Sequence, residues 1–396
     1  MRIVIAPDKF KGSLPATQVA AAIAAGLRTS WPAAELVTIP VADGGEGTVE
    51  AAVAAGFERM PVTVAGPTGE PVHTSYARHG ETAVVELACA CGLTLLPGGR
   101  REPMDASSFG AGQVLAAALG AGARRIIFGV GGSASTDGGA GLIQALGARV
   151  LDSRGSRFGR GLGGGALRDV ASLDLDGLDP ALRTCSVILA TDVTNPLTGP
   201  DGAAEVYGPQ KGASPAQVGE LASGLRHWAA VVAEAVGEDW SQAPGAGAAG
   251  GVGFAALAVL GAEPRPGIGL VLDLAQFDAA LAGADLVITG EGSLDEQSLS
   301  GKAPVGVARA AARHGIPVVA VVGRSTLTGT QLAAAGICAV YMLSDLESDP
   351  ARSSTEASAL LERVGRAIAR DRLGSLADPL TSGPADQGLL IEGTEA

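Results

Sequence analysis

The chain has 396 residues, which is enough for two domains of ordinary size, each with its own core. Its 28 basic and 41 acidic side chains give a net charge of −13, and no basic run is present, which argues against nucleic acid as a partner. Aromatic residues make up only 3% of the chain and glycine contributes 59 residues, so we expect glycine loops rather than aromatic platforms to carry the function.

The first 60 residues predict a strand, a helix and a second strand. Residues 2–6 are a β-branched apolar run, residues 17–27 have helical apolar spacing, and residues 36–41 form another apolar run. From residue 60 to residue 87 the pattern changes to alternation broken by turn residues, which predicts hairpins. We therefore expect a domain boundary near residue 60.

The middle of the chain predicts a second α/β region. A helix is expected over residues 107–121, a strand over residues 125–130, and a glycine loop from Gly131 to Gly141. A short apolar strand at residues 187–190 and a helix at residues 215–236 follow. Gly245–Gly250 matches G-x-G-x-x-G, but no predicted strand precedes it, so we interpret it as a loop that enters a helix.

From residue 274 the chain returns to alternating helices and strands. Runs at residues 286–289, 318–322 and 339–343 have the continuous apolar character of buried parallel strands. With the first two strands they predict an α/β fold, in which both chain ends (residues 1–60 and 275–371) form a Rossmann-like open parallel sheet domain. Residues 61–274 would be an inserted mixed α/β domain. Residues 372–396 lack periodicity, and we expect them to be a disordered tail.

Metal and membrane signals are weak. The four cysteines form no C-x-x-C pair and the four histidines lie outside the glycine motifs, which argues against a zinc site. The apolar run at the N-terminus is too short for a signal peptide, and no uncharged stretch reaches the ~20 residues that a membrane span needs. We expect a cytoplasmic protein with no membrane partner.

Lysine is rare in this chain. The 28 basic residues include only four lysines, and each lies in a Gly/Ser/Pro-rich stretch beside candidate carboxylates: Lys9, Lys11, Lys211 and Lys302. An ammonium group can approach a single phosphate oxygen, whereas guanidinium prefers a planar contact at two points. The lysines therefore indicate loops that bind phosphate. The alternative for any single lysine is that it occurs there by chance in a chain that otherwise uses arginine.

Acid-bearing loops follow the predicted strands. Asp8 and Lys11 come after the first strand, at the sheet edge where open α/β sheets bind ligands. Asp43-Gly44-Gly45 and Asp137-Gly-Gly139, with Ser133 shortly before the latter, place backbone N–H groups at a helix start, which suits phosphate. A tight turn in which the aspartate caps the helix is an equally good interpretation of each loop.

The loop after residue 190 carries a further acid, amide and lysine. Asp192 and Asn195 directly follow a buried strand, where they can bind a metal or a hydroxyl group, and Lys211 lies downstream. The alternative is an Asx turn before Pro196 and a lysine in water.

The loop after residue 289 carries the last group of acids. Glu291 and Asp295 can hold Mg²⁺, and Lys302 can offset phosphate charge at the next helix start. Ordinary first-turn acids are the alternative for Asp295 and Glu296. No Walker A sequence and no G-x-S-x-G elbow occurs, whereas lysines, acids and glycine loops are the groups that phosphoryl transfer uses.

Taken together, these motifs resemble the bacterial glycerate kinase family, which phosphorylates D-glycerate with ATP. The resemblance covers about residues 1–370, and Thr136 stands where many members have asparagine. The stretches that carry it are Ala6–Leu14, Ala42–Thr48, Gly131–Gly139, Asp192–Pro196, Gly208–Gly212 and Thr289–Lys302.

The resemblance implies a kinase that uses Mg²⁺ and ATP, with its site in the cleft between a Rossmann-like domain and an inserted domain. Asp192 is expected to accept a proton or to organise the metal, and Arg101 to clamp the glycerate carboxylate at two points. The expected site residues are Asp8, Lys11, Asp192 and Lys211 for catalysis, Asp43, Gly44, Gly45, Arg101, Ser133, Asp137, Asn195 and Lys302 for substrate or phosphate, and Glu291 and Asp295 for the metal.

The expected product is 2-phosphoglycerate, and two alternatives stay open. One is transfer to the 3-hydroxyl group at the same site, and the other is a non-catalytic sensor that binds a phosphorylated metabolite. Only a kinase needs a carboxylate that activates a hydroxyl group, so Asp192 beside Asn195 favours catalysis. Glycerate and ATP are the expected small-molecule partners, and the sequence leaves a homo-oligomer open.

Overall fold

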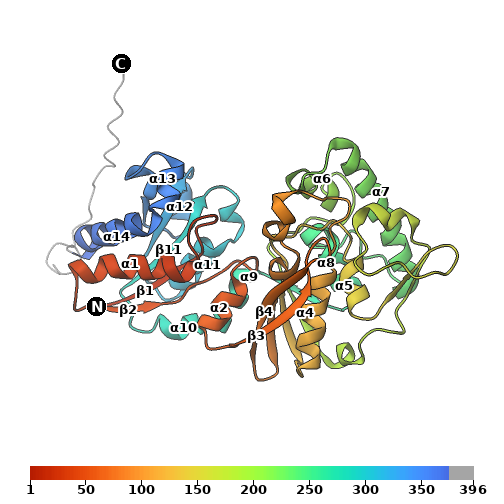
Figure 1. Cartoon of the computed structure of the whole chain (residues 1–396). Coiled ribbons are helices and arrows are strands. Elements are labelled where there is room, and N and C mark those ends of the chain that lie inside the picture. Colours follow the sequence, from red (N-terminus) through yellow and green to blue (C-terminus); the bar gives the residue numbers. More distant parts are fainter. Residues whose placement is uncertain (374–396) are drawn as a thin grey trace, which may run out of the picture.

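The computed structural model describes residues 1–373, which form two lobes that lie side by side (Figure 1). One lobe contains a five-stranded sheet with the order β13-β12-β11-β1-β2, and the other a six-stranded sheet with the order β10-β9-β6-β5-β4-β3. A separate ribbon pairs β7 with β8. The predicted α/β class, with a Rossmann-like parallel sheet and a second mixed sheet, is confirmed.

The five-stranded sheet is built from both ends of the chain and all its strands are parallel. The two apolar faces of the sheet are both covered by helices, which explains why its strands are apolar at successive positions. Its elements are β1 (Arg2–Pro7), α1 (Ala16–Ser30), β2 (Glu35–Thr38), β11 (Leu286–Leu294), α11 (Ala303–Arg313), β12 (Val318–Ser325), α12 (Gly329–Ala334), β13 (Ala339–Met342), α13 (Pro350–Thr355) and α14 (Ala357–Ile368).

The strand order of this sheet reverses between β1 and β11. From β1 the chain moves to β2 on one side, while β11 pairs with the other side of β1, with Pro7 opposite Gly290. Ligands of open α/β sheets bind beyond the carboxyl ends of the strands at such a reversal. The loop that begins at Asp8 therefore starts at the favoured ligand-binding edge, and β11 continues past this point through Glu291 to Leu294, so that its loop begins at Asp295.

The six-stranded sheet begins with two hairpins, as the alternating pattern predicted. β3 (Glu58–Ala65), β4 (Pro71–His79) and β5 (Thr82–Glu86) are antiparallel, whereas β5, β6 (Arg125–Gly129), β9 (Ser186–Ala190) and β10 (Glu263–Arg265) are parallel. The remaining elements of this lobe are α3 (Ala88–Cys91), α4 (Phe109–Gly120), α5 (Ala140–Ala145), β7 (Arg149–Leu151), β8 (Ser172–Asp174), α6 (Ala203–Tyr207), α7 (Pro215–Val236) and α8 (Ala248–Ala258).

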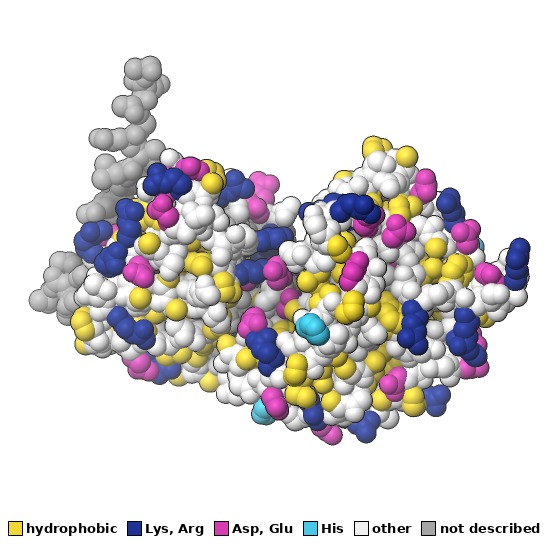
Figure 2. Space-filling model, viewed as in Figure 1, with side chains coloured by type: hydrophobic (Ala, Val, Ile, Leu, Met, Phe, Trp, Pro, Cys, Tyr) yellow, Lys and Arg dark blue, Asp and Glu magenta, His cyan; other side chains and the backbone are white. Residues whose placement is uncertain are grey.

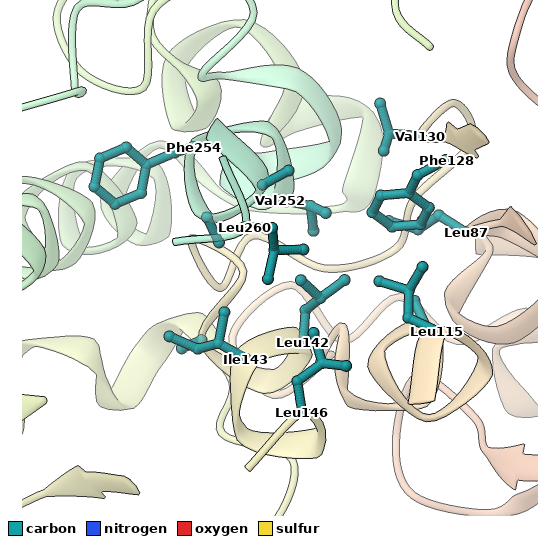
Figure 3. Packing of buried hydrophobic residues seen from close by; sticks show 14 of the residues in the cluster. Leu87, Leu115, Phe128, Val130, Leu142, Ile143, Leu146, Val252, Phe254 and Leu260 are labelled. Carbon is teal, nitrogen blue, oxygen red and sulfur yellow. The ribbon is translucent and has the colours of Figure 1, made fainter. Parts of the chain in front are cut away.

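The largest apolar cluster packs helices against one face of this second sheet. Figure 3 shows Phe128 of β6 and Leu87 after β5 close to Leu115 of α4, with Leu142 of α5 and Val252 of α8 beside them. All five side chains are almost completely buried. Burial of one such side chain contributes about 1.5–3 kcal/mol, so this cluster gives the loops of the second lobe a firm base.

Two helices, α2 (Thr48–Ala54) and α9 (Gly267–Leu274), lie between the two sheets (Figure 1). The short helix α10 (Phe277–Ala280) follows α9, and its Phe277 packs with the first sheet only. The helices α2 and α9, in contrast, contact both sheets. Ala52 and Leu270 belong to an apolar cluster with strands of the second sheet, while Ala51 and Val271 belong to a cluster with strands of the first. The predicted domain limits near residues 60 and 274 stay a prediction, because these helices contact both lobes. The tail predicted to be disordered lies, from residue 374 onward, outside the described residues.

Candidate active site

A cavity of about 720 Å³ opens where the carboxyl ends of the two sheets meet. Figure 2 shows the surface hollowed between the lobes, with acidic and basic side chains gathered around the hollow. Both lobes contribute predicted site residues to its lining. Loops of the first lobe provide Lys11, Asp43, Gly44, Gly45 and Lys302, and loops and turns of the second lobe provide Ser133, Asp192, Asn195 and Lys211. The structure therefore brings most of the motif residues together in one place.

Two glycine loops from different sheets touch at the base of the cavity. Gly131 lies so close to Gly45 that a Cβ atom at Gly131 would be 2.6 Å from the Gly45 Cα. Gly44 has a φ of 88° and packs on Ala190, at the end of β9. Only glycine permits both this backbone conformation and this approach, so the glycine motifs serve to bring the two lobes into contact at the cavity.

The Asp192 carboxyl group belongs to the cavity lining. It is the second residue after β9 and accepts one hydrogen bond, from the backbone N–H of Gly267 at 3.2 Å. Burial, and then the nearby negative charge of Asp43, raise the pKa of Asp192 to about 7. A half-buried carboxylate with a pKa near neutrality suits a general base, because it can hold and release a proton at physiological pH.

Asp8, which was predicted to be catalytic, lies outside the cavity lining and forms an ion pair with Lys9. The Lys9 Nζ lies 3.4 Å from Asp8 Oδ1, and both side chains are largely buried. Burial raises the pKa of Asp8 to about 6, which Lys9 opposes and Asp43 assists. The ammonium group of Lys9 is thus paired with Asp8, whereas Lys11, two residues further along the chain, is exposed and lines the cavity.

Lys211 ends a 3-10 turn, Pro209–Lys211, and its ammonium group is enclosed in the second lobe. Its Nζ donates hydrogen bonds to Ser133 Oγ at 2.8 Å and to the backbone carbonyl of Ser135. Burial lowers the pKa of Lys211 from 10.5 to about 8, and Cys91 and Asp137 oppose this effect. The side chain is only 2% exposed, yet it lines the cavity together with Ser133.

Asp137 does not reach the cavity, although its Asp-Gly-Gly sequence matches that of Asp43. The side chain is completely buried and accepts hydrogen bonds from the backbone N–H and hydroxyl of Ser108 at 2.8 and 2.7 Å, and from the N–H groups of Gly139 and Gly141 at 3.2 Å. Burial raises its pKa and these donors oppose the rise. In this structure Asp137 fixes the shape of the loop below the cavity.

Arg101 also lies outside the cavity lining. It is exposed, and its side chain packs against Gly212, directly after Lys211. The expected two-point contact between Arg101 and a substrate carboxylate therefore has no counterpart in the geometry of the cavity.

The two acids predicted to hold the metal face their own loop. Glu291 accepts a hydrogen bond from the hydroxyl of Ser298, and Asp295 accepts hydrogen bonds from the N–H groups of Gln297 and Ser298 at 3.0 and 3.3 Å. Burial raises the pKa of Glu291 to about 7, an effect that Ser298 opposes. These bonds shape the turn that delivers Lys302, the residue before α11, to the cavity.

Within residues 1–373, no three His, Cys, Asp or Glu side chains are arranged to hold a metal ion. Mg²⁺ in kinases needs fewer protein ligands, because it keeps several waters and shares phosphate oxygens with one or two carboxylates. Asp43 fits this requirement. It lines the cavity, it interacts electrostatically with Asp8, Asp192 and Glu291, and its carboxylate accepts a hydrogen bond at 3.1 Å from the N–H of Gly45 within its own loop.

Sequence reasoning missed Tyr207 and Ala249, which also line the cavity. Tyr207 donates a hydrogen bond from its hydroxyl to Asn195 Oδ1 at 2.7 Å, and the Asn195 amide nitrogen donates to the Asp201 carbonyl at 2.9 Å. Asn195 is thus held on both sides. Neither residue has a local sequence signature, because Tyr207 ends the short helix α6 and Ala249, with a φ of 55°, lies in an Ala/Gly run.

Residues 3–373 match the model of the glycerate kinase family. The chain belongs to this family. It is 48% identical over 330 residues to glycerate 2-kinase of Escherichia coli K12, which covers 82% of this chain and 86% of the relative. It is 44% identical over 372 residues to glycerate kinase of Bacillus subtilis 168, covering 93% and 97%.

A solved structure supports the same assignment. A crystal structure assigned to a glycerate kinase 2 of Salmonella typhimurium LT2 is 43% identical, has a TM-score of 0.81, and covers 96% of this chain and all of that one. The chain is therefore a kinase, and the family resemblance read from the motifs is confirmed. Family membership favours catalysis over the alternative of a non-catalytic sensor. None of the helices in residues 1–373 has the length and apolar character required to cross a membrane.

Proposed function

We propose that this chain transfers the γ-phosphoryl group of ATP to the 2-hydroxyl group of D-glycerate. The single observation that carries the proposal is Asp192, a carboxyl group with a pKa near 7 in a cavity whose other walls supply lysines from both lobes. The names of the relatives support the substrate, and the name of the Escherichia coli enzyme supports transfer to position 2.

In the proposed mechanism, Asp192 accepts the proton of the attacking hydroxyl group. The hydrogen bond from Gly267 N–H to Oδ1 holds the carboxylate in the cavity lining, and within residues 1–373 the other oxygen, Oδ2, accepts no hydrogen bond. Lys11 and Lys302, which approach from the first lobe, neutralise the charge of the phosphate groups. When bound, Mg²⁺ would be held by Asp43 together with phosphate oxygens, and it would supply further neutralisation of their charge.

The first test is ADP release by the purified protein with ATP, Mg²⁺ and D-glycerate, with ADP release in the absence of glycerate as the blank. Phosphorus NMR of the product then distinguishes 2-phosphoglycerate from 3-phosphoglycerate. A 3-phosphorylated product would contradict the assigned hydroxyl group, and ADP release that does not depend on glycerate would contradict the substrate.

The second test concerns the base. Asp192→Asn keeps an oxygen that can accept from Gly267 N–H but cannot take a proton, so turnover should fall by about 10²- to 10⁴-fold. Asp201→Asn is the matched control, because it makes the same chemical change on an exposed side chain further along the same loop, between β9 and α6. Normal turnover in the folded Asp192→Asn variant would remove Asp192 from the mechanism.

A further inference from the structure

The Lys211 ammonium group is buried without a matching negative charge. Within residues 1–373, no carboxylate lies within 4.0 Å of it, and its two hydrogen-bond acceptors, Ser133 Oγ and the Ser135 carbonyl, are neutral. The acids that interact with it electrostatically are Cys91 and Asp137, and the Asp137 carboxylate accepts hydrogen bonds from Ser108. Burial of an unpaired charge is costly, so a counter-charge from outside the chain would be strongly favoured.

Within residues 1–373, the third N–H of this ammonium group has no hydrogen-bond acceptor, and the group borders the cavity. Both Lys211 and Ser133 line it, and so does Ala249, where the backbone adopts a left-handed conformation. At the following residue, Gly250, a Cβ atom would lie 2.8 Å from the Lys211 Nζ. The wall here is bare backbone close to the ammonium group, so Lys211 and Ser133 form a small, rigid corner.

The opposite wall of the cavity has a different character. Lys11 and Lys302 come from two separate loops of the first lobe, and both are more exposed than Lys211. Two accessible ammonium groups match a polyphosphate, which carries several charges and needs several contacts. One enclosed ammonium group with one hydroxyl neighbour matches a compact group with a single negative charge.

We infer that the corner formed by Lys211 and Ser133 binds the carboxylate of the acceptor acid, while the lysines of the first lobe bind the phosphates of the nucleotide. This inference rests on the proposed function and adds to it an orientation for each substrate. It assigns to Lys211 the role that the sequence suggested for Arg101, which lies outside the cavity. It also predicts that the site selects a small hydroxy acid over an uncharged polyol, because a neutral acceptor would leave Lys211 without a counter-charge.

The test compares D-glycerate with D-glyceramide, the amide of the same acid, as acceptors. The two differ mainly in the charge of one group, so their ratio of kcat/KM measures recognition of the carboxylate. We expect wild-type protein to prefer D-glycerate by on the order of 10- to 100-fold, and Lys211→Met to lose most of this preference with its KM for ATP within about threefold of wild type. Lys302→Met is the matched control, which should raise the KM for ATP and keep the preference.

Retention of the acceptor preference in Lys211→Met, with a raised KM for ATP, would overturn the inference and place a phosphate in this corner. If Lys211→Met does not fold, as judged by circular dichroism, Ser133→Ala takes its place, with a smaller expected loss of several-fold. Calorimetric titration of D-glycerate without nucleotide separates the inference from the proposed function. The inference is supported, even if no ADP is released, when the wild-type protein binds D-glycerate but not D-glyceramide and the variants do not bind D-glycerate. A D-glycerate affinity that the variants leave unchanged refutes it.

Discussion

The pKa of Lys211 should rise when D-glycerate binds, and the expected size of the change follows from its surroundings. Burial lowers the pKa from 10.5 to about 8, which corresponds to a cost of about 3 kcal/mol for keeping the ammonium group charged in the folded protein. A carboxylate in contact with Lys211 removes most of this cost. We therefore expect the pKa of Lys211 to rise in the complex, back toward its ordinary value of 10.5.

The sign of the linkage can be checked in both directions. Between about pH 8 and pH 10.5 the unfolded chain holds a proton on Lys211 that the folded chain has released, so this lysine makes the folded state more stable as the pH rises through that window. Binding of D-glycerate needs the charged form. Its affinity should be constant below pH 8 and fall about tenfold per pH unit above it. The acids that interact with Lys211 are Cys91 and Asp137, and both raise its pKa, whereas burial lowers it.

Lysine NMR measures this pKa directly. With lysine labelled with ¹³C at the ε carbon, the chain gives four signals, from Lys9, Lys11, Lys211 and Lys302, and single substitutions assign them. A titration with and without D-glycerate then reports each pKa. The reasoning is refuted if the Lys211 signal titrates near 10.5 in the free protein, or if D-glycerate shifts the Lys302 signal and leaves Lys211 unchanged.

Three further predictions concern the pH dependence of the reaction and the backbone of the cavity. The kcat/KM for D-glycerate should be bell-shaped in pH, falling below about pH 7 as Asp192 gains its proton and above about pH 8 as Lys211 loses its own; a profile flat from pH 6 to 9 would contradict both roles. Gly131→Ala should lower kcat/KM at least tenfold in a folded protein, because the new Cβ would lie 2.6 Å from Gly45 Cα, whereas Gly120→Ala, with open space around it, should leave kinetics unchanged. Ala249→Gly should relieve the left-handed conformation at that residue and raise the free energy of unfolding by up to about 1 kcal/mol, seen as a higher Tm; a lower Tm would show that the backbone there is not strained.

Those parts of the fold that depend on local sequence were predictable. Strand β1 and its parallel neighbours are apolar on both faces, so they appear in the sequence as continuous runs, and β3 and β4 appear as alternation because they form hairpins. Helix α7 has reciprocal hydrogen bonds between Ser214 and Gln217 at its start and Gly237 in a left-handed conformation at its end. Such end signals explain why its predicted limits agree with the structure.

The orientation of the acids was not predictable from local sequence. Asp43 and Asp137 both precede two glycines at a helix start, yet only Asp43 reaches the cavity. The difference lies in Ser108, which is 29 residues away from Asp137 in the chain and donates two hydrogen bonds to it. Asp295 likewise turns toward the N–H groups of its own loop. Such partners are fixed by tertiary packing, which a motif of six residues does not contain.

The helices α2 and α9 constrain how the two lobes can move. Each places apolar side chains against both sheets, so a wide swing of one lobe would expose Ala51 and Val271 on one side or Ala52 and Leu270 on the other to water. Relative displacement should instead occur as shear, in which packed faces slide by small amounts without separating. The span between Lys11 and Lys211 would then change little during a catalytic cycle, and the enzyme would receive its substrates in a cleft that is already close to its working width.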